Sequence, residues 1–138
     1  MNEITIRVVG IPAAQGSKTL TRFGAMIESS KKVKPWRTDV KEASLNCYTS
    51  GALNMPVKVD IEFVFPRPKS HFGTGKNKEV LKASSPQYCT SRGNGDIDKL
   101  CRSTLDGLSV SAGGSVLEDD CLAVELCARK RYVKKDEL

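Results

Sequence analysis

The feature that most constrains the fold is a run of regularly alternating apolar residues. Every odd position from Val57 to Phe65 carries Val, Ile or Phe, whereas three of the four even positions are charged. Successive side chains of a β-strand point to opposite faces, so this pattern is typical of a strand with one buried face. Pro66 and Pro68 follow, and proline cannot donate a hydrogen bond to a neighbouring strand. The sequence therefore predicts a half-buried strand that ends at Phe65.

The rest of the chain contains signals for two helices, a hairpin and two further strands. The expected elements are a strand at Ile4–Val9, a hairpin at Thr19–Glu28 with its turn near Phe23 and Gly24, a helix at about 36–49, a helix at about 98–108 with Asp98 near its N-cap, and a strand at about Leu122–Tyr132. This order predicts an α+β fold in which a mixed β-sheet packs against helices. A length of 138 residues suits a single domain over 1–138.

A long polar stretch at 66–95 interrupts this order. It is rich in Ser, Gly, Lys and Pro, and between Arg67 and Arg92 it carries six basic residues and one acid. Loops of this length are uncommon in compact domains and are usually functional or disordered. We expect this basic loop to contact a nucleic acid, with a flexible insertion as the alternative.

Charge is unevenly distributed along the chain, whose formal net charge is +6. Residues 31–41 include five bases and one acid, and residues 129–135 include five bases and no acid. Between 96 and 125 the sign reverses, with seven acids and two bases. Basic flanks favour a polyanionic partner such as nucleic acid, although solvated surfaces also carry such runs. Clustered carboxylates repel one another, and a bound cation is a common reason to retain them.

Several classes of protein are disfavoured. No apolar run approaches the ~20 residues of a membrane span, and the alternating N-terminus with its Glu3 does not resemble a signal peptide. The C-terminal Lys135–Leu138 matches an ER-retention signal, which acts only on secreted chains, so we interpret it as a coincidence. Five cysteines without a CxxC pair argue against a zinc site or a disulfide framework, and we expect small core thiols. We expect a cytoplasmic protein that uses neither a membrane nor an organic cofactor.

Two acidic motifs are candidates for a metal site. Asp96 and Asp98 lie two positions apart, so in an extended segment their carboxylates point to the same side. Asp119 and Asp120 precede the last expected strand, and a turn at Gly113–Gly114 would return that strand beside the preceding helix. Carboxylate oxygens suit Mg²⁺, with Mn²⁺ as an alternative, and a metal held this way can hydrolyse a phosphodiester. The alternatives are an Asp-rich helix cap and a solvated polar turn.

Two bases follow the first acidic motif within about one helical turn. Lys99 and Arg102 are placed to stabilise the charge that develops on a phosphate under attack. Alternatively, Arg102 forms an i,i+4 ion pair with Asp106, which contributes only tenths of a kcal/mol. A further interpretation is that Asp106 orients a metal ligand.

The two acidic motifs resemble the core of the RusA-like Holliday junction resolvases. The stretch GDIDKLCRSTLDGLS, followed by LEDDCLAVELCARKRY, is similar to that family's D-x-D-[N/K]-L signature and its later D-D dipeptide at the start of a strand. VKVDIEFVFPRPKSHFGTGKN resembles the strand and basic loop of phage members, and GIPAAQGSKTLTR resembles their opening strand and turn. The similarity covers nearly the whole chain, although Lys99, Arg102 and Gln15 stand where many members carry Asn, Lys and a base, respectively.

The resemblance implies a Mg²⁺-dependent endonuclease in the cytoplasm of a bacterial cell or a phage-infected host. It implies a homodimer that resolves four-way DNA junctions by paired nicks during recombination and repair. It places catalytic roles at Asp96, Asp98, Asp120 and Arg102, with Asp119 as a further metal ligand. The residues that we expect to contact DNA are Lys18, Arg67, Lys69, His71, Lys76, Lys78 and Lys99.

Two other functions stay open from the sequence. One is a nuclease of the same fold that acts on other branched DNA, and the other is a non-catalytic basic DNA-binding protein. A pure binding module has no reason to place carboxylates inside a phosphate-binding surface, where they would repel DNA. The acidic motifs therefore favour a nuclease.

Overall fold

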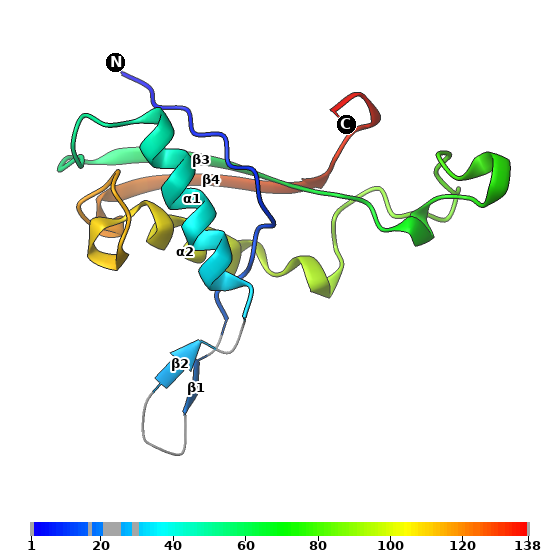
Figure 1. The fold of residues 1–138 in the computed structure, drawn as a ribbon, viewed down its shortest axis with the longest axis horizontal. Coiled ribbons are helices and arrows are strands. Elements are labelled where there is room, and N and C mark those ends of the chain that lie inside the picture. Colours follow the sequence, from blue (N-terminus) through cyan, green and yellow to red (C-terminus); the bar gives the residue numbers. More distant parts are fainter. Residues whose placement is uncertain (1, 17, 21–25, 29–30, 138) are drawn as a thin grey trace.

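The fold is built around a pair of long parallel strands with two helices beside it (Figure 1). The computed structural model describes residues 2–16, 18–20, 26–28 and 31–137, with side chains for 2–16 and 31–137. Strand β3 (Val57–Phe65) pairs in parallel with β4 (Ala123–Tyr132). Because parallel strands need a crossover connection, the chain between them carries helix α2 (Ile97–Leu108). The α+β class is confirmed.

Helix α1 (Val33–Cys47) packs against α2, and together they cover the apolar face of the strand pair. The core joins both helices to both strands; its buried members include Val33, Trp36, Val40, Phe63, Phe65, Leu100, Cys101 and Tyr132. The Trp36 indole donates a 3.0 Å hydrogen bond to the Thr104 hydroxyl, so its N–H is satisfied inside the core. At the helix crossing, a Cβ on Gly107 would lie 3.0 Å from Val40, so glycine permits this close approach.

The predicted hairpin is confirmed as β1 (Lys18–Leu20) and β2 (Met26–Glu28), which pair antiparallel (Figure 1). Its predicted turn near Phe23 lies outside the described residues. Among the described residues, the hairpin and the β3–β4 pair form two separate sheets, so the expectation of one mixed sheet was wrong.

The predicted first strand at Ile4–Val9 was also wrong. Its residues alternate between half-buried and exposed, and Val8 packs against the core, but the segment forms no strand ladder. An alternation of apolar and polar residues shows only which side of an extended chain is buried. Here that side is partly buried by packing against the rest of the protein, without a paired strand.

Most predicted boundaries agree with the structure to within three residues. The strand at 57–65 is confirmed without change, and β4 begins one residue later than predicted. Helix α1 begins at Val33, three residues before the predicted start, because Pro35 in the first helical turn loses no intrahelical hydrogen bond. Helix α2 begins at Ile97, and its N-cap is Asp96, not Asp98.

The 66–95 stretch contains three short 3₁₀ turns, η1 (Lys69–His71), η2 (Gly75–Asn77) and η3 (Arg92–Asn94), and an isolated antiparallel bridge between Phe72 and Leu81. Its first half projects away from the helices and strands (Figure 1). At its base, the Arg67 guanidinium lies 4.4 Å from the centre of the Tyr132 ring and donates to the Pro86 carbonyl at 2.7 Å. The cation–π contact therefore holds the loop to the end of β4, and the hydrogen bond to Pro86 joins two parts of the loop itself.

The cysteines only partly match the expectation of core thiols. Cys89 and Cys101 are buried, whereas Cys47, Cys121 and Cys127 are exposed. Burial raises the pKa of the Cys101 thiol, and the nearby Asp98 charge adds to this effect. Within the described part of the chain, no helix is long and apolar enough to cross a membrane.

Candidate active site

The first acidic motif lies at the N-terminus of α2. Asp96 is the N-cap residue in extended conformation, and its side chain makes no capping hydrogen bond. Asp98 follows in the first helical turn, where the positive end of the helix dipole favours a carboxylate. Both carboxylates are exposed, and Asp96 accepts a 3.1 Å hydrogen bond from Lys99 Nζ. Lys99, predicted to contact DNA, is thus paired with the first aspartate of the motif.

The backbone directly before Asp96 is held in place by a glycine, Gly95, and a lysine, Lys130. Gly95 adopts a φ of +88°, and a Cβ there would lie 2.7 Å from Ala14 Cβ, so no other residue fits without a shift. Lys130 of β4 donates from Nζ to the Gly95 carbonyl at 2.7 Å. Lys130 pairs with Phe63 in the ladder, so its side chain lies on the face that the helices cover. Sequence reasoning missed this role, although a lysine at an inward position of a strand was a signal for it.

The second acidic motif lies where the chain enters β4. Asp119 is the N-cap of a 3₁₀ turn, η5 (Asp120–Leu122), and accepts a 3.0 Å hydrogen bond from the backbone N–H of Cys121. This bond lowers the pKa of the Asp119 carboxyl, and an interaction with Asp120 lowers it further. The pKa of Asp120 is raised, first by partial burial and then by the neighbouring Asp119 and Asp106 charges. Such a pair of crowded carboxylates is stabilised by a cation.

The structure brings the two motifs onto elements in contact, but it does not gather them into one cluster. Helix α2 contacts both η5 and β4. The first motif lies at the start of α2, where Lys130 also binds. Asp120 of the second motif interacts electrostatically with Asp106, near the end of α2. Among the described residues, no group of three or more acidic, His or Cys side chains is close enough to hold a metal ion. The predicted meeting of Asp120 with Asp96 and Asp98 is therefore not formed in this structure.

Asp106 pairs with a residue that sequence reasoning did not single out. Arg37 of α1 donates to Asp106 at 2.9 Å and also to the side-chain oxygen of Gln15. The alternative pairing of Arg102 with Asp106 is therefore wrong, because the Asp106 carboxylate faces α1 instead. Arg102 is exposed on α2, and it takes part in no ion pair of the described residues. It stays free to approach a phosphate.

The residues predicted to contact DNA fall into two groups. Lys69, Lys76 and Lys78 are exposed on the projecting loop, and a hollow of about 590 Å³ there is lined by Lys69 and Lys78, among others. Arg67 and His71 instead pack at the base of the loop, where the His71 ring meets the Tyr132 ring edge-on at 5.3 Å. The side chain of the remaining candidate, Lys18, lies outside the described residues.

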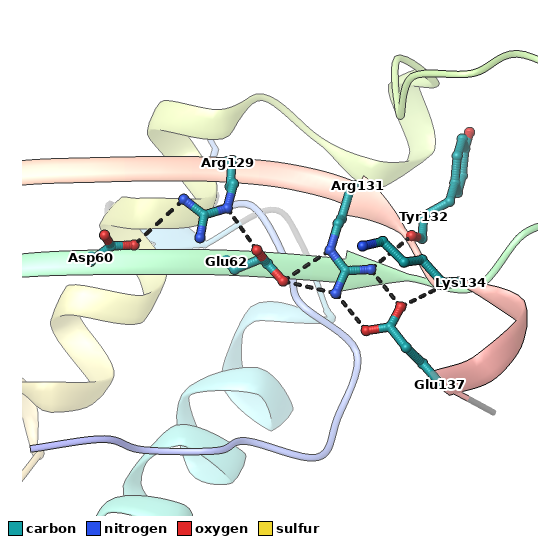
Figure 2. A network of polar contacts seen from close by, with 7 residues as sticks. All are labelled: Asp60, Glu62, Arg129, Arg131, Tyr132, Lys134 and Glu137. Atoms are coloured by element: carbon teal, nitrogen blue, oxygen red, sulfur yellow. Dashed lines mark hydrogen bonds and ion pairs between the residues drawn. The ribbon is translucent and has the colours of Figure 1, made fainter.

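Two of the five bases in the run at 129–135, Arg129 and Arg131, form ion pairs within the described part of the protein. Figure 2 shows Glu62 of β3 between two arginines of β4, at 2.6 Å from Arg129 and 2.8 Å from Arg131. Arg131 also binds Glu137 at 2.6 Å, which joins the C-terminal 3₁₀ turn η6 (Lys135–Glu137) to the strands. Both arginines are thus engaged in ion pairs within the protein, and the expectation that this run faces a polyanionic partner stays a prediction.

A comparison with protein families now bears on this arrangement. The family model described as "RusA: Endodeoxyribonuclease RusA" matches residues 10–138. The chain belongs to the RusA family. Neither a curated protein nor a solved structure matches it significantly. Membership implies an endodeoxyribonuclease that resolves Holliday junctions, and the matched region contains every aspartate of the two motifs.

Proposed function

We propose that this RusA-family chain is a Mg²⁺-dependent endonuclease that acts as a homodimer and resolves four-way DNA junctions by paired nicks. The observation that carries the proposal is the placement of the acidic motifs. Asp96 and Asp98 begin α2, and Asp120 lies in η5, a turn that contacts α2. The four motif carboxylates thus lie at the starts of two elements that contact each other, α2 and η5.

The chemistry of the side chains fits a hard divalent cation. Asp96, Asp98, Asp119 and Asp120 offer only carboxylate oxygens, which Mg²⁺ and Mn²⁺ prefer. The pKa of Asp120 is raised first by burial and then by the neighbouring Asp119 and Asp106 charges, and a bound cation would counter these effects. When bound, the metal would supply an activated water and stabilise charge on the phosphate. Among the described residues, the two motifs do not form one cluster in this structure.

The protein's own residues would act on the DNA backbone. Arg102 is exposed one helical turn after Asp98, on the helix that carries the first motif. A guanidinium there is placed to bind a phosphate oxygen through two N–H groups. Lys69, Lys76 and Lys78 of the projecting loop would bind phosphates farther along a junction arm and position it.

The homodimer is supported by the open edge of β4. In the described part of the chain β4 pairs only with β3, and Val124 and Leu126 on it are 71% and 46% exposed. A two-stranded sheet is marginally stable alone, and an uncovered strand edge is a template for another strand. A second copy that adds its own β4 across a two-fold axis would bury these side chains. A two-fold dimer also suits the paired scissile strands of a junction.

The experiment that tests this function compares a synthetic four-way junction with a linear duplex of matching sequence, each in Mg²⁺ and in EDTA. The proposal predicts cleavage of the junction alone and only with the metal. Equal cleavage of flapped or forked DNA would instead identify a nuclease for other branched DNA. Junction binding without cleavage would identify a non-catalytic DNA-binding protein.

A further inference from the structure

A second basic surface lies on α1, away from the projecting loop. A hollow of about 630 Å³ separates α1 from the turn that follows α2. Its charged lining consists of Lys31, Lys34, Arg37 and Lys41, and no acidic side chain lines it. Gly107 and Gly113 form part of the opposite wall, and nothing lies within 4 Å of the Cβ position of Gly113. Backbone of this kind lets a ligand approach closely.

The positive charge of this hollow is mostly uncompensated. Of the four cations, only Arg37 forms an ion pair with a described residue, Asp106. The Nε atom of Arg37 is buried without a hydrogen-bond partner, which is an unusual state for a charged donor. The three lysines of the hollow, which form no ion pair with a described residue, differ in this from Arg129 and Arg131, which are paired with described carboxylates.

The position of the lysines on α1 adds a second unfavourable interaction. Lys31 and Lys34 lie at the N-terminus of α1, and the first helical turn contains no acid. The N-terminal end of a helix carries partial positive charge, so cations there are repelled and anions are favoured. A bound anion would relieve both this repulsion and the repulsion among the hollow's own cations.

The hollow adjoins the second acidic motif. Ala112 and Gly113 line the hollow. The backbone N–H of Ser111, the residue before them, donates to the backbone carbonyl of Glu118 at 3.3 Å. Arg37 reaches from the hollow to Asp106 of α2, and α2 contacts the turn η5 that carries Asp120. A polyanion in the hollow would therefore continue directly towards Asp119 and Asp120.

The dimensions suit a nucleic-acid strand. Lys34 and Lys41 are two helical turns apart on one face of α1, a span of ~10 Å at ~1.5 Å rise per residue. One strand of duplex DNA carries a phosphate every ~3.4 Å along the helix axis, so this span covers about three phosphates. Lys34, Arg37 and Lys41 lie along this span and Lys31 lies just before it, an arrangement that matches a short stretch of backbone better than a single small anion.

We propose that the α1 hollow binds the phosphodiester backbone of the DNA next to the strand that is cleaved, through Lys31, Lys34, Arg37 and Lys41. This inference rests on the proposed function, because the DNA it names is an arm of the junction. It adds a contact surface with a lining distinct from that of the projecting loop.

The test measures the salt dependence of binding to the four-way junction and to a matching duplex, in EDTA so that no strand is cut. The variant is Lys34→Gln with Lys41→Gln, both exposed side chains outside any described ion pair. The control is Lys32→Gln with Lys58→Gln, which removes the same charge from exposed lysines that do not line the hollow. Circular dichroism of each variant verifies the fold.

Each lost phosphate contact lowers the slope of log Kd against log salt by ~0.9. We expect the hollow variant to lose a slope of ~1.8 and the control less than ~0.5. Equal losses in both variants would overturn the inference and leave the proposed function standing. If only the hollow variant loses slope, but the wild-type protein binds junction and duplex alike and cuts neither in a parallel assay with Mg²⁺, the hollow is supported and the proposed function is refuted. Wild-type protein that binds neither DNA would overturn both.

Discussion

Lys130 of β4 donates a 2.7 Å hydrogen bond to the carbonyl of Gly95, the residue directly before Asp96. The ladder partner of Lys130 is the buried Phe63, so the ammonium reaches across the covered face of the strands to the start of α2. A charged donor on a carbonyl in such a place makes a stronger bond than a neutral pair. Lys130 therefore fixes the backbone from which the first acidic motif extends.

Replacing Lys130 by Met keeps the apolar stem and removes this hydrogen bond. A hydrogen bond to a charged group contributes about 1.5–3 kcal/mol. We expect kcat for junction cleavage to fall about tenfold or more, with KM nearly unchanged, because ~1.4 kcal/mol corresponds to tenfold in rate. Lys58→Met, on the outward face of β3, is the control. Unchanged kcat in a folded Lys130→Met protein would show that this contact does not position the motif.

Asp98→Asn tests the first acidic motif directly. The amide keeps the size of the side chain and removes the charge that a metal ligand needs, and metal ions supply several kcal/mol of transition-state stabilisation. We expect cleavage to fall at least about a hundredfold, while junction binding in EDTA stays intact or tightens. Asp60→Asn, an exposed aspartate on the outward face of β3, is the control. Wild-type cleavage by Asp98→Asn would remove Asp98 from the metal site.

Local patterns in the sequence predicted the elements well. The alternation at 57–65 predicted both ends of the strand correctly, because a strand with one buried face carries an apolar residue at every second position. The apolar spacing from Leu100 to Leu108 likewise fixed α2, since a helix that packs on one face repeats its contacts every three to four residues. Both signals depend only on near neighbours in the chain.

Contacts between distant segments were not predictable in this way. Ile4–Val9 alternates as a strand does, but whether a neighbour pairs with it depends on the fold. Asp106 had Arg102 one helical turn away in sequence, yet it binds Arg37, which lies 69 positions away. The same limit applies to the acidic motifs, because their distance in space depends on how the turn before β4 returns the chain to α2.

The dimer proposal predicts that a charge on the β4 surface separates the subunits. Val124 is 71% exposed, and a second copy would bury it, so Val124→Lys should place an unpaired charge in the interface. We expect light scattering to give about twice the 15.1 kDa chain mass for the wild type and the single-chain mass for the variant. Val9→Lys, at an 89% exposed position outside the strands, is the control and should stay dimeric. A monomeric wild type would contradict the homodimer.

The C-terminal turn should confer a pH-dependent part of the stability. Hydrogen bonds from Arg131, then from the backbone of Lys134, lower the pKa of Glu137 from its ordinary 4.5 to about 2. Because the pKa is lowered on folding, the stabilisation is fully present above pH 4.5 and is lost as the pH falls towards 2. Figure 2 shows the contacts concerned.

Glu137→Gln should therefore melt at a lower temperature than the wild type at pH 7, and the two curves should converge as the pH approaches 2. The difference should be small, since Glu137 is at the surface and water screens its charge. Asp136→Asn is the control, because Asp136 is in no described ion pair. A constant difference in melting temperature across the whole range would mean that ionisation of Glu137 is not responsible.

The central claim is that this chain cuts both symmetry-related strands of a four-way junction in a metal-dependent reaction. The most direct measurement labels two opposing strands of one synthetic junction and follows both in the same reaction with Mg²⁺, followed by DNA ligase. The account predicts nicks at symmetric positions in both strands, ligatable products, and no cleavage in EDTA. Tight junction binding with no cleavage in Mg²⁺ or Mn²⁺ would contradict it and leave the aspartates with a structural role.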